Sequence, residues 1–452
     1  MDFITDNYKN YIKFLKELAA MPSVFSTTKD VEKAIMFCKR TFKENLNNYI
    51  VYSDKEKNLV AVPKDINPAE DIVYLSAHID TVNADPKEWD KPFHPWKIYE
   101  DKDEIVGRGV SDCKAGVAYQ LFLSFLAKKD LVSFKNLIFT VTFKEEGSGE
   151  KTVIEIAKEI GKKIPVSKKS TYLIVLENNV TVDTIPTLGV YTSERGNFVA
   201  KITDTIPNLQ KYLMALPHWN PVCIKPQIKN GNLSWKTEKQ SGGHVCSVDR
   251  DHNLLTKIIL NAEANSIIKA GSESSFSVMP TEILIAKGGN LKKHSLIINN
   301  RFPDSAKDVL RQLHGIKHEE TKRFSISEGF DIGKKFKKDK ISKILEKCRN
   351  KSELKLEYTC NVGASDATAI YASINPKIKP SFFPIVMGPG SRSQRNRSPQ
   401  RLTHGINETF HKESGKRTII FITKVLRELK CLAENERFFT QEEVMREFGV
   451  IA

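Results

Sequence analysis

A histidine and an aspartate follow the apolar segment 72–77, and they are the first residues whose types and spacing indicate chemistry. His78 and Asp80 lie two positions apart, so on a strand their side chains share one face and project together at its carboxyl end. In open α/β sheets, ligands bind at that end. A carboxylate beside a histidine can also hold the imidazole in the tautomer that a metal ion requires. Taken alone, the pair is weak evidence, because such pairs also occur at strand ends by chance.

Carboxylates occupy two further segments of this kind. Asp112 lies among the glycines of segment 107–116 and precedes a predicted helix, where an ordinary N-cap is the alternative interpretation. Glu145 and Glu146 follow the apolar strand segment 137–143. Adjacent strand residues point to opposite faces, so one glutamate can bind a metal while the other acts as a base. An exposed acidic turn explains the pair less well, because two like charges at the end of an apolar strand repel one another unless a cation offsets them.

Two more residues of metal-binding type extend the pattern. Glu177 closes the apolar run 172–176, and His404 lies in segment 402–408, after a strand and the glycine turn 388–390. A histidine in a loop is ordinarily solvated, so His404 gains its weight from the other four segments. Together the five segments favour a site built at the ends of strands.

The elements that position these residues follow from hydrophobic periodicity, which alternates between strand-like and helix-like segments. This alternation predicts an α/β fold whose catalytic sheet is mostly parallel and flanked by helices. Continuous apolar runs are typical of strands that are covered on both faces. The strands are predicted at 58–62, 72–77, 137–143, 172–176 and 383–387, and the helices at 8–20, 114–127, 150–160, 339–348 and 416–432.

A chain of 452 residues exceeds one ordinary core, so we expect two domains. The region 190–302 has a different pattern, with strands predicted at 197–202, 282–286 and 296–300 and a helix near 253–270. We expect it to be a second domain inserted into the first. The predicted division is therefore 1–189 for the first part of the catalytic domain, 190–302 for the insertion and 303–452 for the second part.

Composition excludes several classes of protein. With 40% hydrophobic and 9% aromatic residues the chain can bury true cores, which excludes a disordered or fibrous protein. Seven cysteines without a CxxC pair indicate neither a disulfide framework nor a zinc finger. No apolar run approaches the roughly 20 residues of a membrane helix, and the first residues lack the apolar stretch of a signal peptide. We therefore expect a cytoplasmic protein that does not bind membranes.

These residues resemble the zinc aminoacylase, acetylornithine deacetylase, succinyl-diaminopimelate desuccinylase and carboxypeptidase G family of metallohydrolases. The resemblance runs from segment 21–24 after the first helix to the His-Gly-x-Asn-Glu motif at 404–408. It implies two Zn²⁺ ions and assigns the ligands as follows: His78 and Glu177 to one ion, Glu146 and His404 to the other, and Asp112 as the bridge. It also implies that Asp80 orients His78 and that Glu145 is the general acid/base.

The chemistry of these side chains agrees with the resemblance. Imidazole nitrogen and carboxylate oxygen suit Zn²⁺, and two ions about 3.5–4 Å apart can share a water whose pKa falls toward about 7. Glu145 would take the proton of that water as hydroxide attacks an amide carbonyl, and would then pass it to the departing amine. Co²⁺ or Mn²⁺ could occupy the same ligands.

In the inserted region, the resemblance implies a smaller α+β, ferredoxin-like domain through which the protein forms a homodimer. His244 follows two glycines and resembles the histidine that this domain presents to the oxyanion. Arg301 resembles the arginine that grips a substrate carboxylate in a bidentate manner. A surface salt bridge is an equally weighted alternative for Arg301.

The predicted function is removal of an acyl group from an N-acyl amino acid, or release of a C-terminal amino acid from a small peptide. Glutamate at position 177 favours this reading, because in the family that residue tends to accompany deacylases and carboxypeptidases, whereas aspartate tends to accompany dipeptidases and aminopeptidases. A dipeptidase or aminopeptidase is the nearest alternative.

A net charge of +15 leaves a non-catalytic protein that binds nucleic acid or an acidic partner as an alternative of another class. Such a protein would be expected to have lost a ligand or the base. Because all of them are present, we expect a small carboxylate-bearing amide as substrate and no nucleic acid.

Overall fold

The computed structural model describes most of the catalytic region and parts of the inserted region. The described residues are 2–194, 196–204, 227–229, 232–234, 277–285, 294–302, 318–320, 329–350, 352–361, 365–394 and 404–435. Between 196 and 320 the description is of the backbone.

The helices of the described chain are mostly two to five turns long. They are α1 (Asp2–Ala19), α2 (Thr28–Asn45), α3 (Lys114–Lys128), α4 (Glu145–Glu159), α8 (Gly333–Lys338), α9 (Lys340–Arg349), α10 (Asp366–Ser373) and α11 (Lys412–Glu428), with a short 3₁₀ turn at Lys379–Ser381.

Eleven strands form one large sheet, which is the framework of the molecule. They are β1 (Tyr49–Ser53), β2 (Leu59–Pro63), β3 (Ile72–His78), β7 (Leu137–Thr142), β8 (Thr171–Val175), β9 (Val180–Val182), β10 (Thr187–Glu194), β17 (Phe330–Asp331), β18 (Lys355–Asn361), β19 (Phe382–Val386) and β20 (Ser391–Gln394). Their main order is β1-β2-β7-β3-β8-β19-β10-β9-β20, with β17 and β18 paired to β10.

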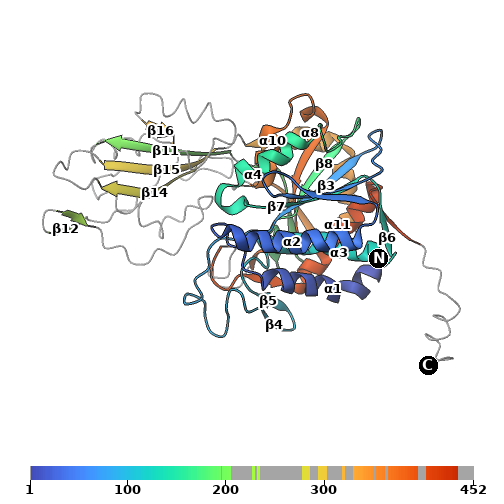
Figure 1. Ribbon diagram of the computed structural model, residues 1–452, viewed down its shortest axis with the longest axis horizontal. Coiled ribbons are helices and arrows are strands. Elements are labelled where there is room, and N and C mark those ends of the chain that lie inside the picture. Colours follow the sequence, from blue (N-terminus) through green and yellow to red (C-terminus); the bar gives the residue numbers. More distant parts are fainter. Residues whose placement is uncertain are drawn as a thin grey trace.

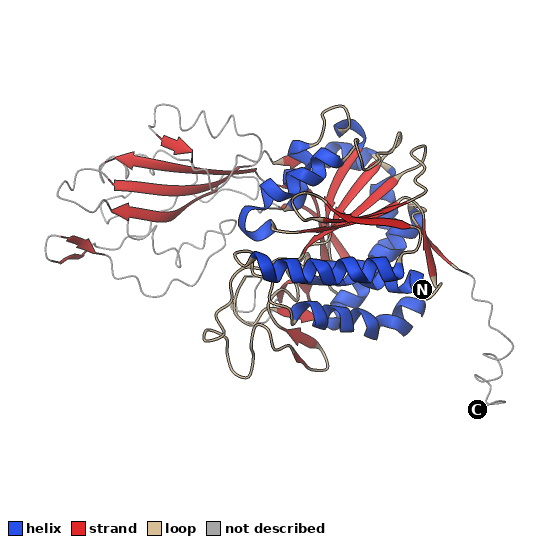
Figure 2. Cartoon of the chain, in the orientation of Figure 1, coloured by secondary structure: helices blue, strands red, loops and turns tan. Residues whose placement is uncertain are grey.

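The centre of this sheet is parallel, as the sequence predicts. Strands β7, β3, β8 and β19 run in the same direction, with His78 opposite Thr142 and Val386 opposite Val175. All seven residues of β3 are buried, in keeping with a strand covered on both faces. Helices α1, α2 and α3 lie on one side of the sheet and α4 and α10 on the other (Figure 1). The same layers are visible by element type in Figure 2. The predicted α/β fold is confirmed.

Three helices begin earlier than the sequence predicts, and one of them is α1, which starts at Asp2 rather than near residue 8. Helix α4 begins at Glu145 rather than near 150, because the Asp80 carboxylate accepts the backbone N–H groups of Glu145 and Glu146 at 2.9 and 3.0 Å. These are N–H groups that a helix cannot satisfy internally. Helix α11 begins at Lys412 because the His411 side chain caps it, accepting the N–H of Ser414 at 3.2 Å. The two glutamates follow β7 as predicted, but they lie in the first turn of a helix, so the expectation that they point to opposite faces of a strand is wrong.

The inserted region contributes a separate antiparallel sheet. Its strands are β11 (Gly196–Asp204), β14 (Ser277–Ile285), β15 (His294–Phe302) and β16 (His318–Glu320), in the order β14-β15-β11-β16. A two-stranded ribbon of β12 (Gln227–Lys229) and β13 (Asn232–Ser234) is also described. The boundaries of the insertion stay predictions, although β10 belongs to the large sheet as far as Glu194. The helix predicted near 253–270 lies outside the described residues.

Two small sheets join distant segments of the catalytic region. One contains β21 (Thr409–His411), β5 (Glu104–Val106) and β4 (Tyr99–Glu100), and the other pairs β22 (Leu432–Glu434) with β6 (Val132–Phe134). The first sheet matters for function, because β5 and β21 connect the segment that precedes Asp112 to the segment that follows His404.

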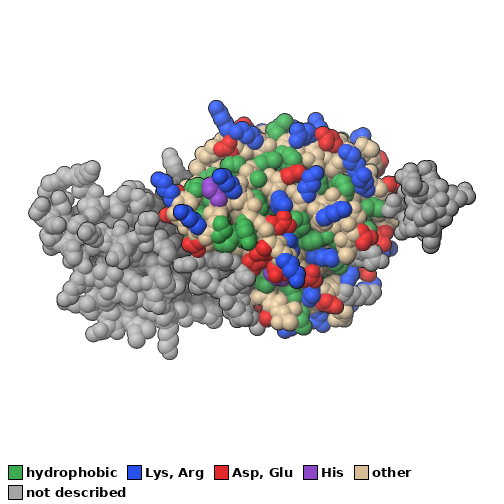
Figure 3. All heavy atoms as spheres, turned by 90° about the horizontal axis from the view of Figure 1, so that it is seen from below, with side chains coloured by type: hydrophobic (Ala, Val, Ile, Leu, Met, Phe, Trp, Pro, Cys, Tyr) green, Lys and Arg blue, Asp and Glu red, His purple; other side chains and the backbone are tan. Residues whose placement is uncertain are grey.

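Charged side chains of both signs are mixed on the surface, and the described cysteines are free. Figure 3 shows lysine and arginine side chains spread over one face with acidic side chains between them, rather than gathered in one patch. Within the described chain, the free cysteines are Cys38, Cys113, Cys348 and Cys431, and all four are buried. None of the described helices combines the length and the hydropathy needed to span a membrane.

Candidate metal centre

Five segments bring the predicted ligands to the carboxyl edge of the parallel strands. His78 is the last residue of β3, and Glu177 lies two residues beyond β8, which neighbours β3. Glu146 lies in the first turn of α4, directly after β7 on the other side of β3. Asp112 and His404 come from the loops before α3 and β21. The cluster therefore occupies the edge at which ligands bind in open α/β sheets.

Asp112 lies between the two histidines. Its Oδ1 is 2.9 Å from Nε2 of His78, and its Oδ2 is 3.0 Å from Nε2 of His404. All three side chains are largely withdrawn from solvent, with His78 only 1% exposed and His404 26%. Burial opposes ionisation, but the two imidazoles hold the pKa of Asp112 below its ordinary value. A carboxylate that offers one oxygen to each of two histidines has the geometry of a bridge between two cations.

The remaining predicted ligands lie on either side of this bridge. Glu146 Oε1 is 2.9 Å from His404 Nε2, and Glu177 Oε2 is 3.8 Å from His78 Nε2. Three groups of three side chains each place one ligand atom within 4.8 Å of the others: Asp112, Glu146 and His404; His78, Cys113 and Glu177; and His78, Glu145 and Glu146.

The charges of the cluster also fit cations. Burial, together with the nearby Asp112 and despite the His78 imidazole, raises the pKa of Glu177 well above its ordinary value. Its Oε1 atom is buried and has no hydrogen-bond partner in the described chain. Buried polar atoms are normally paired, so an unpaired oxygen on a carboxylate whose other oxygen lies 3.8 Å from His78 Nε2 is a donor that a metal ion could use. The residues present therefore fit a pair of divalent cations.

Asp80 acts on two neighbours at once. Its backbone carbonyl lies 3.0 Å from His78 Nδ1, and this contact leaves Nε2 facing the cluster. Its carboxylate is more distant from that ring, with Oδ1 at 3.6 Å, and instead caps α4 through the N–H groups of Glu145 and Glu146. The Asp80 side chain thus connects the segment of His78 to the turn that carries both glutamates.

Glu145 is placed as a proton acceptor beside the predicted ligands. It shares a ligand-distance group with His78 and Glu146. Burial raises the pKa of Glu145 well above its ordinary value; the His78 imidazole opposes this shift, and the Glu146 and Glu177 carboxylates add to it. A glutamate in such surroundings can both accept and return a proton.

The glycine turn 388–390 packs against two ligand segments. A Cβ atom on Gly388 would lie 2.1 Å from the carbonyl oxygen of Glu177, and one on Gly390 would lie 2.2 Å from that of Ser111. Both positions therefore require glycine because another backbone passes too close for a side chain.

The substrate residues predicted in the insertion are not brought to the cluster by the described structure. His244 lies outside the described residues. Arg301 lies in β15, opposite Asn197 of β11 and Ser277 of β14, and only its backbone is described. Their roles stay predictions.

Sequence reasoning missed three residues beside the cluster. Glu408 and Arg108 are 1% and 2% exposed and form an ion pair at 2.8 Å. The sequence held a signal for both. Arg108 stands in the segment of Asp112 and Glu408 in the segment of His404, and the two residues carry opposite charges. Cys113 contributes the third side chain to the group with His78 and Glu177, and its thiol donates to the carbonyl of Leu176.

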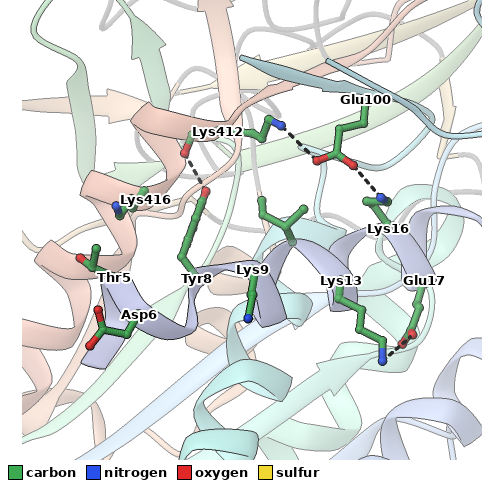
Figure 4. Close-up of a pocket in the computed structure, with 11 residues that line it drawn as sticks. Thr5, Asp6, Tyr8, Lys9, Lys13, Lys16, Glu17, Glu100, Lys412 and Lys416 are labelled. Carbon is green, nitrogen blue, oxygen red and sulfur yellow. Dashed lines mark hydrogen bonds and ion pairs between the residues drawn. The ribbon is translucent and has the colours of Figure 1, made fainter. Parts of the chain in front are cut away.

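A groove of about 650 Å³ lies elsewhere, between α1 and α11 (Figure 4). Its charged side chains are largely paired with one another: Lys16 and Lys412 contact Glu100 at 2.6 and 3.0 Å. The hydroxyl of Tyr8 donates to the carbonyl of Lys412 at 2.6 Å. None of the predicted ligands lines this groove, so it is a junction between helices rather than the candidate site.

Comparison with known proteins gives one family match and several relatives. The family model of Peptidase family M20/M25/M40 matches residues 74–428. An acetylornithine deacetylase of Arabidopsis thaliana is 31% identical over 71 residues, 16% of this chain and 16% of that protein. A second, of Dictyostelium discoideum, is 28% identical over 133 residues, 28% of each chain. The chain thus matches less than a third of the length of either deacetylase. A succinyl-diaminopimelate desuccinylase of Rickettsia prowazekii (strain Madrid E) is 24% identical over 277 residues, 58% of this chain and 69% of that protein.

Solved structures share the fold over nearly the whole chain. Human carnosine dipeptidase 1 superposes with a TM-score of 0.63 at 12% identity, covering 95% of this chain and 98% of that one. An M20 family metallo-carboxypeptidase of Sulfolobus solfataricus gives a TM-score of 0.62 at 14% identity, with 93% and 99% covered. A Bacillus subtilis protein described as a dinuclear metal binding peptidase gives 0.55 at 11% identity, with 94% and 99% covered. At these identities the likeness shows the fold.

Proposed function

Because the chain belongs to Peptidase family M20/M25/M40, and is thus a hydrolase of amide or peptide bonds, we propose that it is a di-zinc amidohydrolase acting on N-acyl amino acids or on the C-terminal residue of small peptides. The observation that carries the proposal is the position of Asp112, whose two carboxylate oxygens each face the Nε2 atom of one histidine.

The proposed ligands divide into two sets around that bridge. His78 and Glu177 would hold one ion, Glu146 and His404 the other, and Asp112 would bridge them. When bound, such a pair of ions lowers the pKa of a shared water toward about 7 and polarises a carbonyl oxygen. The nitrogen and oxygen donors suit Zn²⁺, and they also accept Co²⁺ or Mn²⁺.

Glu145 supplies the proton transfers in this proposal. Its carboxylate would take a proton from the attacking water and deliver it to the amine nitrogen as the C–N bond breaks. A raised pKa suits both steps, because a base that is too weak cannot take the proton and one that is too strong cannot release it. Asp80 would hold this carboxylate in place through the first turn of α4.

The preferred substrates are acylated amino acids that keep a free α-carboxylate. Three curated relatives are named as deacetylases or a desuccinylase, which supports this choice. A dipeptidase or aminopeptidase would use the same centre, and it is distinguished by a requirement for a free α-amine. Turnover should be measured with N-acetyl, N-succinyl and N-formyl amino acids and with short peptides, in zinc and in cobalt. Cleavage confined to substrates with a free α-amine would replace the proposal with the dipeptidase reading, and no cleavage of any amide would contradict it.

Arg301 is proposed to bind the substrate carboxylate, and the small domain that carries it is proposed to form the homodimer. Arg301→Ala should raise KM for carboxylate substrates far more than for the corresponding carboxamides. Arg301→Lys serves as the matched control, because it keeps the charge and loses the bidentate geometry. An equal change in KM for both kinds of substrate would leave Arg301 without this role.

A further inference from the structure

Glu408 accepts four hydrogen bonds from the loop that carries Asp112. Its Oε2 accepts from Arg108 Nη1 at 2.8 Å and from the backbone N–H of Gly109 at 2.9 Å. Its Oε1 accepts from the N–H groups of Ser111 and Asp112, both at 2.9 Å. Glu408 is only 1% exposed, so these bonds are sheltered from water. One carboxylate thus fixes the backbone on the amino side of the bridging aspartate.

Arg108 also contacts the loop that carries His404. Its Nη2 donates to the carbonyl of Gly405 at 2.9 Å, and Gly405 directly follows His404. The guanidinium is 5.7 Å from the ring centroid of Trp89 and is almost fully buried. The ion pair therefore joins the loop that carries Asp112 to the loop that carries His404.

We propose that Arg108 and Glu408 are positioning residues that set the distance between Asp112 and His404, so that both metal ions are held at once. We call this pair the Arg108–Glu408 clamp. The inference rests on the proposed function, because it concerns the same metal pair. Neither residue touches the cluster with its side chain; each acts through the backbone of a ligand loop.

The chemistry of the clamp requires a carboxylate at position 408. A carboxylate offers acceptors on both oxygens, whereas an amide offers one acceptor oxygen and an NH₂ group that only donates. In Glu408→Gln, whichever way the amide turns, its NH₂ group faces two donors of the Asp112 loop. The loop then shifts or loses bonds, and Arg108 loses the partner of its buried charge.

Other contacts between the two segments survive this substitution. The backbone N–H of Gly107 donates to the carbonyl of Glu408 at 3.0 Å, and the hydroxyl of Ser111 donates to the carbonyl of Thr409 at 2.9 Å. Strand β5 also pairs with β21. We therefore expect Glu408→Gln to fold, with its main defect in the geometry of the metal pair.

The matched control is Asp54→Asn, a carboxylate-to-amide change remote from the cluster. Asp54 is 8% exposed and accepts the N–H groups of Glu56 and Asn58 at 2.9 Å and the Asn58 side chain at 2.7 Å. It caps a turn between β1 and β2, and through Asn58 it is linked to the backbone of Phe143 and Thr152. In the described chain none of these contacts reaches the loops of Asp112 and His404, so its loss tests destabilisation without a direct change in those two loops.

The experiment measures metal binding and backbone protection in the full-length wild type, Glu408→Gln and Asp54→Asn. Zinc is titrated by equilibrium dialysis, the two-manganese form is examined by electron paramagnetic resonance for coupling between the ions, and hydrogen exchange is followed at residues 107–112. We expect Glu408→Gln to bind the ion that depends on His404 roughly 10- to 100-fold more weakly, the range for supporting partners of metal ligands. We also expect it to lose the coupled signal and to exchange the amides of Gly109, Ser111 and Asp112 faster. Asp54→Asn should keep the zinc affinity, the coupled manganese signal and the amide exchange rates of the wild type, even where its unfolding temperature falls as far as that of Glu408→Gln.

Two results overturn the clamp: wild-type affinities with a coupled signal in Glu408→Gln, or unchanged protection of residues 107–112. If the wild type itself binds no pair of ions, the proposed function fails, and the exchange comparison still decides whether Glu408 holds the Asp112 loop. Should Glu408→Gln not fold, Arg108→Lys keeps the charge but cannot reach both Glu408 and Gly405. It should then show the same changes, and wild-type behaviour in it would overturn the proposal.

Discussion

Glu145 and Glu146 are neighbours in the chain, yet their surroundings assign them different tasks. Glu146 Oε1 lies 2.9 Å from Nε2 of His404, among the ligand atoms that surround Asp112. Glu145 belongs only to the group that also contains His78 and Glu146, and burial raises its pKa well above the ordinary value for glutamate. Both stand in the first turn of a helix, where successive side chains point in directions about 100° apart. This geometry is consistent with the proposed division into a ligand and a base.

Replacing the proposed base should separate catalysis from metal binding. Glu145→Gln keeps the size of the side chain and removes its ability to take a proton, so kcat should fall roughly 10²–10⁴-fold, the range for one general acid–base group. Metal content, measured by elemental analysis, should stay at two ions per chain. Glu155→Gln on the same helix is the control, because Glu155 pairs with Lys55 at 3.2 Å and not with the cluster. Activity close to the wild type in Glu145→Gln would remove the base assignment.

Removing one histidine should remove one ion. His404→Ala takes away a nitrogen donor that faces both Asp112 and Glu146, so we expect about one ion per chain after dialysis and little turnover. His94→Ala is the control, because His94 only accepts the backbone N–H of Trp96 at 3.1 Å. Two tightly held ions in His404→Ala would show that this histidine is not a ligand.

At the scale of secondary structure, the beginning of α4 is the element on which the site depends. Asp80 stands after β3 and caps α4, which follows β7, so one carboxylate joins two neighbouring parallel strands above their carboxyl ends. The sequence predicted that Asp80 orients His78 through its carboxylate. The structure adds a second contact, because Nδ1 of the imidazole donates to the Asp80 carbonyl while the carboxylate binds the helix.

This arrangement predicts the effect of Asp80→Asn. The backbone carbonyl that contacts His78 is unchanged, so metal content should stay near two ions, whereas the weaker cap should misplace Glu145 and lower kcat more than it changes KM. Loss of a helix cap costs about 0.5–2 kcal/mol of stability. Asp339→Asn is the control, because Asp339 caps α9 by accepting the N–H of Ile341 at 2.9 Å. A different result is that Asp80→Asn binds fewer metal ions but keeps the wild-type kcat per bound metal pair. Asp80 would then act on His78 and not on α4.

Much of this arrangement could be predicted from the sequence, and the rest depends on contacts between remote residues. The apolar runs before His78 and Glu177 predicted buried parallel strands, because strand burial depends on local pattern. The beginning of α4 was missed, since its cap comes from Asp80, which follows β3 rather than the strand that leads into α4. The Arg108–Glu408 clamp was missed for a similar reason: the two charges stand in separate motifs 300 positions apart, and neither motif shows that they pair.

At the scale of the whole molecule, the metal pair would join segments that only the folded chain brings together. The proposed ligands end β3, follow β8, lie in the first turn of α4 and precede α3 and β21. Because the unfolded chain holds these donors far apart, metal binding is coupled to folding of the catalytic region. The domain boundaries at 189 and 302 and the dimer role of the small domain stay predictions.

Metal removal should therefore lower the stability of the whole catalytic region. A ligand that binds only the folded state stabilises it by about 2.7 kcal/mol at a concentration a hundred times its Kd. We expect the chelated protein to unfold at a lower temperature than the zinc-loaded protein in calorimetry, and His404→Ala to show a smaller difference. Equal unfolding temperatures with and without zinc would contradict a site assembled from these five segments.

X-ray absorption at the zinc edge on the fully loaded protein tests the central claim most directly, because it reports the neighbours of each ion. A binuclear centre predicts two ions per chain, nitrogen and oxygen neighbours from imidazole and carboxylate, and a metal–metal distance of about 3.5–4 Å. His404→Ala should abolish the metal–metal contribution. A single isolated ion in the wild type, or a first shell without imidazole, would contradict the binuclear centre.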